Sequence, residues 1–267
     1  DLVTVGARPL TVHAYWALEN NDWLSDRQRM TDLITGWKKA CDASGASWGG
    51  GETPTLKGIV VPNTCEFGGS AVGIIKNKKK LLTDKKLKAG DRILLLKSSG
   101  VNANGLSLAR AIAKKLPSGY ATKLPSGKYY GEALLAPTNI YAKLVQDLLK
   151  AKIDIHYISN ITGHGLRKVM RDRQELAYMI EKIYPISELF AFIQKQADLS
   201  DYQMYETYNM GMDYAIFLPA KYVKKALVIV KNNGFSCLDA GYVKKGAKQV
   251  IIQPTNLTYT AGTMDLR

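Results

Sequence analysis

The chain has few of the residues that mark secreted, metal-binding or membrane-spanning proteins. Its 267 residues include three cysteines and three histidines. Cys41, Cys65 and Cys237 are odd in number and far apart, which argues against a disulfide framework and indicates reduced thiols in a cytoplasmic protein. No histidine, cysteine and acid spacing suggests a zinc site. No apolar run approaches the ~20 residues that a membrane-spanning helix needs, so no membrane association is expected.

The printed sequence also lacks an initiator methionine and a basic-then-apolar leader. We therefore expect no secretory signal, and we expect the numbered sequence to lack an upstream part.

Acidic residues are fewer than basic ones. The chain has 23 Asp and Glu and 37 Lys and Arg, which gives a formal net charge of +14. This excess raises the hypothesis of a nucleic-acid partner. The richest basic stretch, residues 76–88, contains no aromatic residue to stack on a base and no arginine to read a base edge. We interpret it as a solvated linker, and we expect no nucleic-acid partner. The diffuse positive field would attract anionic nucleotides and sugar phosphates.

Two glycine-containing loops carry the first indication of a function. The run ITGHGL at residues 161–166 follows an apolar strand-like stretch and opens into a basic segment. A strand, a glycine loop and a helix start expose backbone N–H groups to an anion. The same order recurs in the apolar run 93–96, the small-residue loop 98–105 and the helical pattern 106–116. Together the loops predict a phosphorylated small-molecule substrate, although turn geometry alone explains either one about equally well.

The lysine-rich stretch also indicates a boundary, which divides the chain into domains 1–88 and 89–267. In the first domain we expect a helix over 25–43, a glycine-rich loop at 49–53 and strands within 58–76. In the second we expect strands at 176–180, 214–218 and 250–253, helices at 187–197 and 220–232, and a further helix that starts at Pro137 and Thr138. This pattern predicts an α+β fold with α/β-type layers and mixed strands.

Several short motifs, taken in order, resemble the aminoimidazole ribonucleotide synthetase family, also called the phosphoribosylformylglycinamidine cyclo-ligases. The first domain contains DLV and GARPL within residues 1–10 and GGET at 50–53. The second contains GD at 90–91, SSGVNANGLSL at 98–108, LLAPTNIY at 134–141, ITGHG at 161–165 and MYETYNMG at 204–211. Any one motif is modest evidence, but their shared order covers almost the whole chain.

The resemblance implies an aminoimidazole ribonucleotide synthetase-like, two-domain fold whose N-terminal domain is incomplete in this chain. Residues 1–88 would be the C-terminal part of an ATP-binding and dimerisation domain, and residues 89–267 the C-terminal α/β domain. A DGVGTK segment of the family would lie upstream of Asp1. The implied protein is a homodimer that binds ATP, Mg²⁺ and a phosphoribosyl substrate between its domains, and closes the ring of formylglycinamidine ribonucleotide in purine biosynthesis.

Carried over residue by residue, the resemblance implies Asp1 and Glu52 as metal ligands. The implied nucleotide-binding residues are Asp1, Gly50, Gly51, Glu52 and Thr53. The implied substrate-binding residues are Ser99, Gly100, Asn104, Gly105, Thr162, Gly163, Gly165 and Asn209. The candidate catalytic side chains are Glu52, Asn102 and His164. A turn for Asp1, a cap for Glu52 and a cap or turn for Asn209 remain open as structural alternatives, and Thr138 is predicted as a helix N-cap rather than a ligand.

The chain departs from the family pattern at several of these places. Asn102 takes a position that is usually histidine, and asparagine can form hydrogen bonds but cannot shuttle a proton near neutral pH. Arg8 replaces an acid, Thr55 begins a segment that replaces Glu-Met-Pro, and His164 replaces a glycine, where it could contact phosphate or donate a proton. Two alternatives therefore stay open: another ATP-using member of the superfamily, or a non-catalytic paralogue that binds nucleotide or sugar phosphate.

Overall fold

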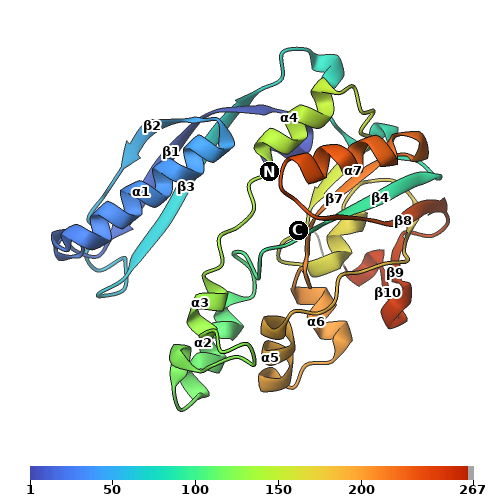
Figure 1. Cartoon of the computed structure of the whole chain (residues 1–267). Helices are drawn as coiled ribbons and strands as arrows, with labels where there is room; N and C mark the ends of the chain where they lie inside the picture. The colour runs from blue at the N-terminus through green and yellow to red at the C-terminus, as the bar shows by residue number, and fades with distance from the viewer. Residues whose placement is uncertain (264–267) are drawn as a thin grey trace. The chain divides into compact units, whose positions relative to one another are not determined.

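The computed structural model describes residues 1–263, which form two compact units (Figure 1). Unit 1 comprises residues 1–81 and 140–147, and unit 2 begins at residue 82 and contains the rest of the described chain. Helix α4, Ala142–Lys150, contributes residues to both units. Each unit combines a β-sheet with helices, in agreement with the predicted α+β class.

Unit 1 is built on a three-stranded sheet whose central strand is β1, Arg8–Leu18. Strand β2, Ser47–Glu52, pairs parallel with β1, and β3, Cys65–Ile74, pairs antiparallel on its other side. The predicted glycine-rich loop is therefore wrong, because most of it is strand β2. Gly51 has a φ of 155°, and a Cβ atom there would lie 1.9 Å from the Ala14 carbonyl oxygen. The sheet needs a glycine where two backbones approach this closely.

Helix α1, Arg27–Ser44, confirms the helix predicted over 25–43. The Asp26 side chain accepts a hydrogen bond from the Arg29 backbone N–H at 3.0 Å and caps the N-terminus. Trp37 packs against Trp16 of β1 with ring centroids 5.6 Å apart. Side chains alternate across a strand, so Tyr15 points away from this helix, and it is 44% exposed. Unit 1 therefore has one sheet face packed on α1 and another that exposes apolar side chains.

Unit 2 contains a seven-stranded sheet in the order β10-β9-β6-β8-β4-β7-β5. The pairs are antiparallel except β6 with β9, so the sheet is mixed, as predicted. The strands are β4 Asp91–Lys97, β5 Tyr157–Asn160, β6 Leu176–Ile180, β7 Met212–Pro219, β8 Cys237–Lys245, β9 Gln249–Ile252 and β10 Leu257–Thr260. The apolar run 93–96 lies in β4, is completely buried and forms part of the core.

The longer helices of unit 2 are α2 Leu106–Lys115, α5 Glu188–Ala197 and α7 Val223–Asn232. Shorter ones are α3 Tyr130–Leu134 and α6 Asp201–Thr207. The 3₁₀ turns of the chain are Leu2–Val5, Asn21–Ser25, Lys78–Lys80, Asp84–Lys86, Gly119–Ala121, η6 Gly165–Met170, Ala220–Tyr222, Gln253–Thr255 and Ala261–Thr263.

Three local predictions need correction. Helix α4 begins at Ala142, so its N-cap position is residue 141 and Thr138 lies three residues too early. The strand predicted within 58–76 begins only at Cys65, since turns occupy the preceding residues. The segment after the ITGHG run is the 3₁₀ helix η6 rather than an α-helix, and all six of its residues are buried.

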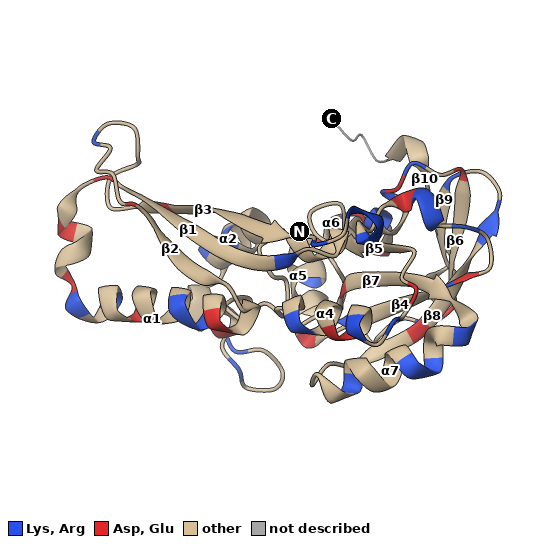
Figure 2. Ribbon diagram, turned by 90° about the horizontal axis from the view of Figure 1, so that it is seen from above, with Lys and Arg blue, Asp and Glu red and all other residues tan. Residues whose placement is uncertain are grey.

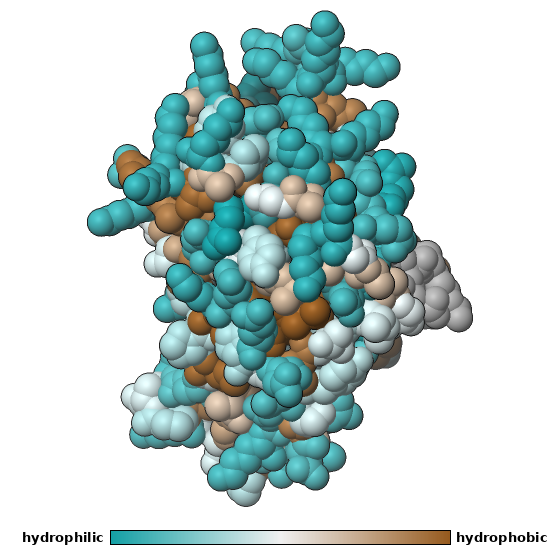
Figure 3. Space-filling view, turned by 90° about the vertical axis from the view of Figure 1, so that its right-hand side faces the viewer, coloured by the Kyte–Doolittle hydropathy of each residue, from teal (hydrophilic) through white to brown (hydrophobic). Residues whose placement is uncertain are grey.

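Charged residues are distributed over both units. Figure 2 shows acidic and basic residues interspersed along α1, and basic residues along α7. The face in Figure 3 is mostly hydrophilic, with apolar side chains in small separate areas. Through residue 263, every helix is too short or too polar to cross a lipid bilayer.

The buried carboxylate Asp84 predicts acid sensitivity of unit 2. Its oxygens accept hydrogen bonds from the Arg173 backbone N–H and guanidinium at 2.7–2.9 Å, and these bonds lower the pKa of Asp84 to about 2. As the pH falls, the Asp84 carboxylate is therefore protonated in the unfolded chain before it is protonated in the folded protein. The stabilisation that it provides is present above about pH 4 and is lost as the pH falls toward 2. In urea denaturation, we expect Asp84→Asn to remove about 1 kcal/mol at pH 6 and much less at pH 2.

The exposed Glu175→Gln provides the matched control, since its carboxylate lies on the surface two residues after Arg173. A loss in Asp84→Asn that is equal at both pH values would contradict the proposed ionic contribution.

Candidate functional site

The topology of unit 2 brings three sequence-distant segments to one end of its sheet. Strands β4 and β5 both pair antiparallel with β7, so β4 and β5 run in the same direction. The loops that follow them, 98–105 and 161–165, therefore leave the sheet at the end where β7 begins. The segment before β7 contains Asn209. All of the substrate-binding residues predicted from the family resemblance lie on these three segments.

Asn209 connects these segments through its side-chain amide. Its Nδ2 donates to the Gly100 carbonyl oxygen at 2.8 Å, while its Oδ1 accepts from Ser98 Oγ at 3.1 Å and from the Gly211 backbone N–H at 2.9 Å. The residue is 2% exposed. A buried amide that satisfies both of its ends rigidifies the surrounding backbone. The geometry gives Asn209 a positioning role, and it contacts the loop that contains Ser99 and Gly100.

Asn102 and Asp213 join the second pair of segments. Asn102 Nδ2 donates to Asp213 Oδ2 at 3.0 Å, and the backbone carbonyl of Asp213 accepts from the Ile161 N–H at 2.9 Å. Asn102 has a φ of 56°, a left-handed conformation that asparagine tolerates better than most residues. Among residues 1–263, its buried Oδ1 has no hydrogen-bond partner. This atom is available to accept a hydrogen bond from a ligand, whereas proton transfer through the amide is not available.

Two glycines predicted to bind substrate also have packing roles. A Cβ at Gly105 would lie 2.1 Å from the ring of Tyr208, whose hydroxyl donates to the Gly105 carbonyl oxygen at 3.0 Å. Burial raises the pKa of Tyr208 to about 12, so this donor stays protonated. A Cβ at Gly165 would lie 2.0 Å from the Tyr205 carbonyl oxygen. These contacts explain both glycines without a ligand.

Gly163 is where the two loops approach each other. A Cβ there would lie 3.2 Å from Asn104 Oδ1, so the amide of Asn104 lies beside the backbone of the ITGHG loop. The loop is turned tightly, since the N–H groups of His164 and Gly165 both donate to the Thr162 carbonyl oxygen at 2.9–3.0 Å. Polar groups from both predicted loops are thus brought together, as a single ligand site requires.

Basic side chains surround His164 in this region. Arg167 is buried and forms an ion pair with Glu206 at 2.8 Å. Desolvation, followed by the charges of Arg167, Lys168 and Arg171, lowers the pKa of His164. The imidazole is therefore neutral at pH 7, which does not support the prediction that His164 contacts phosphate as a cation.

The predicted nucleotide residues lie in unit 1. Gly50, Gly51 and Glu52 belong to β2, and Thr53 follows it on the surface. Glu52 is opposite Tyr15 on β1, whereas Asp1 precedes the turn that leads into the start of that strand. The intervening part of β1 spans roughly 20 Å. The Asp1 and Glu52 side chains of one chain therefore cannot bind the same metal ion.

The protein side chains do not form a metal centre by themselves. Across the described residues 1–263, no group of three or more His, Cys, Asp and Glu side chains could hold a metal ion. Gly50 has no atom within 4 Å of the position its Cβ would take, so the surface beside Glu52 is open. A magnesium ion here would depend on the oxygen atoms of its nucleotide for most of its ligands.

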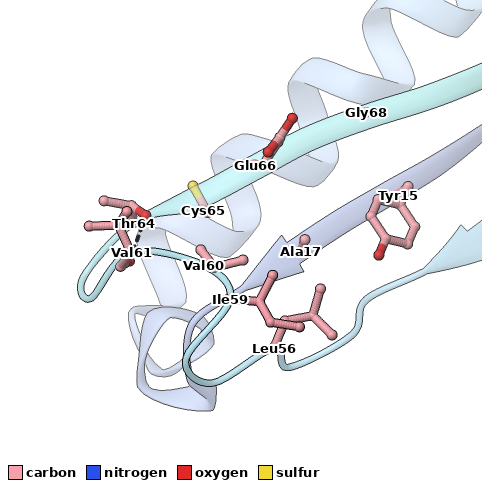
Figure 4. A pocket seen from close by; sticks show the side chains of 10 residues that line it. All are labelled: Tyr15, Ala17, Leu56, Ile59, Val60, Val61, Thr64, Cys65, Glu66 and Gly68. Carbon is pink, nitrogen blue, oxygen red and sulfur yellow. Dashed lines mark hydrogen bonds between the residues drawn. The ribbon is translucent and has the colours of Figure 1, made fainter.

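A pocket of about 410 Å³ lies at the C-terminal end of β1 in unit 1, the same end of the strand as Glu52 (Figure 4). It is lined by Tyr15, Ala17, Leu56, Ile59, Val60, Val61, Thr64, Cys65, Glu66 and Gly68. The lining is mainly apolar and includes no lysine or arginine, so it supplies no counter-charge for a triphosphate. None of the predicted nucleotide-binding residues lines it.

Sequence reasoning missed three residues of the unit 2 site: Lys168, Tyr208 and Asp213. Tyr208 lies within a recognised motif, next to Asn209, and Lys168 within the basic segment after ITGHG. Asp213 has no local pattern that distinguishes it from other strand residues. Its pairing with Asn102 joins residues 111 positions apart, which hydrophobic periodicity cannot indicate.

Both parts of the chain match known domains. Residues 1–75 match the N-terminal domain and residues 88–253 the C-terminal domain of AIR synthase related proteins. The chain therefore belongs to the class of AIR synthase related proteins. Phosphoribosylformylglycinamidine cyclo-ligase of Rippkaea orientalis is 32% identical over 95% of this chain and 74% of its own length. That of Carboxydothermus hydrogenoformans is 31% identical over 94% and 73%. The chain belongs to the phosphoribosylformylglycinamidine cyclo-ligase family, which confirms the resemblance found in its motifs.

Solved structures confirm the fold. Hydrogenase maturation protein HypE aligns with a TM-score of 0.67 and 18% identity over 94% of this chain and 74% of its own. HypE has also been solved in complex with ATP. Thiamine-monophosphate kinase from Stenotrophomonas maltophilia K279a aligns with a TM-score of 0.63 and 17% identity over 94% and 73%. At these identities the similarity establishes the architecture alone.

Proposed function

We propose that the protein catalyses the ATP-dependent ring closure of formylglycinamidine ribonucleotide to aminoimidazole ribonucleotide, with release of ADP and phosphate. The observation that carries this proposal is the match to curated cyclo-ligases over about 95% of the chain. The convergence of loops 98–105 and 161–165 supports it, since it gathers the polar groups that a phosphoribosyl substrate requires.

The proposed reaction has two steps. The γ-phosphoryl group of ATP is transferred to the amide oxygen of the substrate, which releases ADP and makes that oxygen part of a good leaving group. The neighbouring nitrogen then forms the new C–N bond, and the C–O bond breaks with departure of phosphate. Such chemistry depends on positioning and on electrostatic stabilisation of the phosphoryl group. The chain supplies hydrogen-bonding groups at Asn102, Asn104 and Thr162 for the substrate.

Unit 1 is the proposed nucleotide-binding part. Gly50, Gly51, Glu52 and Thr53 form one exposed segment, and Asp1 contributes at the other end of β1. We assign Glu52 and Asp1 to separate positions around ATP and Mg²⁺. Bound Mg²⁺ would neutralise charge on the transferred phosphoryl group, while Glu52 would orient the metal-bound nucleotide. The open space beside Gly50 supports this placement.

The proposal includes a homodimer that works in the cytoplasm. Tyr15 and Val72, on the sheet face of unit 1 that α1 does not cover, are 44% and 52% exposed. Apolar side chains aligned on one sheet face favour contact with a second sheet. Three free cysteines are consistent with a reducing compartment.

The decisive test is ADP release by the full-length protein with Mg·ATP, with and without formylglycinamidine ribonucleotide, while aminoimidazole product is followed in parallel. We expect ADP and product to form in equal amounts only when substrate is present. Binding of substrate without any turnover would instead identify a non-catalytic paralogue. ADP release that depends on another acceptor would identify a different ATP-using member of the superfamily.

Glu52→Gln tests the proposed nucleotide site. Removal of the carboxylate charge is expected to lower kcat/KM for Mg·ATP by about tenfold or more, because a metal-orienting oxygen ligand is lost. The folded state should be unaffected, since Glu52 is exposed at the end of β2. Glu66→Gln, an exposed carboxylate on β3 of the same sheet, is the control. Equal activity of Glu52→Gln and wild type would show that Glu52 does not belong to the nucleotide site.

A further inference from the structure

The least expected group in unit 2 is a buried lysine beside the ITGHG loop. Lys168 lies in η6 and is 5% exposed. Its backbone carbonyl oxygen accepts from Ser159 Oγ at 2.6 Å, and its ammonium Nζ donates to Thr162 Oγ1. The side chain is therefore directed from the middle of η6 back to the loop that precedes it.

The charge of Lys168 has no counter-ion within the described chain. Among residues 1–263, no carboxylate lies within ion-pair distance of Nζ, and the nearby Glu206 is paired with Arg167. An ammonium has three N–H donors, and the described residues supply one acceptor, the hydroxyl of Thr162. A cation removed from water without a partner is costly, so this arrangement indicates a place for an anion.

The surrounding charges are positive as well. Burial and the charge of Arg171 lower the pKa of Lys168 to about 8, so the side chain remains mainly a cation at pH 7. Arg171 is exposed, and His164 is neutral at this pH because its own pKa is lowered. The positive potential at the loop thus comes from Lys168 and Arg171.

We propose that Lys168 binds the phosphate group of the phosphoribosyl substrate, with its two remaining N–H donors directed to phosphate oxygens beside Thr162. This inference rests on the proposed function for the identity of the substrate, but not for the anion site itself. Lys168 takes the role that sequence reasoning considered for His164. A charged hydrogen bond to phosphate at a nearly buried position is stronger than the same contact at the surface.

Calorimetric titration of the full chain with ribose 5-phosphate, and separately with inorganic phosphate, tests this site. We expect Lys168→Met and Lys168→Gln to weaken ribose 5-phosphate binding about tenfold or more at pH 7. Lys168→Gln keeps a donor for Thr162 and loses only the charge, so it tests the cation if the Met variant does not fold. The control Lys224→Met removes a surface lysine of α7 and should bind as wild type does.

Two further measurements separate binding from a structural role. Without ligand, Lys168→Met should unfold at the same temperature as wild type or higher, since an uncompensated buried cation is removed. Phosphate should raise the unfolding midpoint of wild type and not that of the variant. The proposal is overturned if both Lys168 variants bind ribose 5-phosphate as tightly as wild type does, or if wild type binds neither probe.

The same experiments test the cyclo-ligase function separately from the role of Lys168. Lys168-dependent binding of ribose 5-phosphate in a protein that makes no aminoimidazole product would support the anion site and reject the cyclo-ligase. Normal turnover by Lys168→Gln, with an unchanged preference for the ribonucleotide over its dephosphorylated ribonucleoside, would support the cyclo-ligase and reject the role of Lys168.

Discussion

Gly165→Ala is expected to lower the free energy of unfolding by about 3–5 kcal/mol. Gly165 has a φ of 55°, and its added Cβ would lie 2.0 Å from the Tyr205 carbonyl oxygen and 2.8 Å from that of Tyr208. Both neighbours are backbone atoms, which cannot move aside as a flexible side chain can. Relief of the overlap would require η6 and α6 to separate, and the ITGHG loop would lose its position. Urea denaturation followed by circular dichroism measures the loss.

Gly119→Ala is a closely matched control. Gly119 has a φ of 52°, but its added Cβ would be 3.7 Å from the nearest atom, the Ala113 carbonyl oxygen. The variant therefore carries the left-handed strain without the overlap and should lose about 1–2 kcal/mol. Similar losses in the two variants would show that crowding around Gly165 does not determine its importance.

Asn209→Ala should have the second largest effect, on both stability and activity. It removes the amide that bonds to the Gly100 carbonyl oxygen, Ser98 Oγ and the Gly211 N–H. Ser98 Oγ can still donate to the Gly100 carbonyl oxygen at 3.2 Å, whereas the Gly211 N–H loses its buried partner. Each unsatisfied buried group costs about 1–3 kcal/mol, and partial relaxation makes a total of about 3 kcal/mol a reasonable expectation. Because loop 98–105 loses one of its attachments and keeps that of Asn102 to Asp213, kcat/KM for the ribonucleotide should fall by about a hundredfold.

Asn209→Asp distinguishes the donor from the acceptor side of this contact. The carboxylate can still accept from Ser98 and Gly211, but it cannot donate to the Gly100 carbonyl oxygen and would repel it. We expect losses of activity and of stability close to those of Asn209→Ala, since the new charge would be buried against a carbonyl oxygen. Asn233→Ala, which removes an amide that donates to the Ile229 carbonyl oxygen at the end of α7, should leave kcat/KM unchanged. A full activity for Asn209→Asp would contradict the importance of the bond to Gly100.

Several elements could be predicted because their patterns are local. The apolar run 93–96 lies in a central buried strand, and the helices predicted over 25–43 and 187–197 correspond to α1 and α5. Strand β6 coincides with the predicted range 176–180. These elements depend on side chains that are neighbours in the same strand or helix turn, so the period of hydrophobic residues is sufficient to find them.

The wrong predictions concern features that turn residues and hydrophobic periodicity do not determine by themselves. Glycines at 49–51 are typical of a loop, but the close approach of β1 makes them part of a strand. Pro137 and Thr138 form a convincing helix start, yet the chain enters α4 only at Ala142. A cationic role for His164 is not favoured, because desolvation, followed by the charges of Arg167, Lys168 and Arg171, lowers its pKa. These basic residues lie in the adjacent segment of the sequence, but only the folded loop shows how they are placed around the imidazole.

The sequence by itself determined the family, the mixed α+β class and the three segments on which the substrate residues lie. It could do so because ordered motifs and hydrophobic periodicity are properties of the chain read locally. Only the tertiary structure decided that Asn209 joins Ser98 across 111 positions and that Asp1 and Glu52 lie toward opposite ends of β1. It also decided that Lys168 is a buried cation with no counter-ion among residues 1–263. Strand pairing and burial decide these features. Both depend on which residues from distant parts of the sequence pack together in the fold.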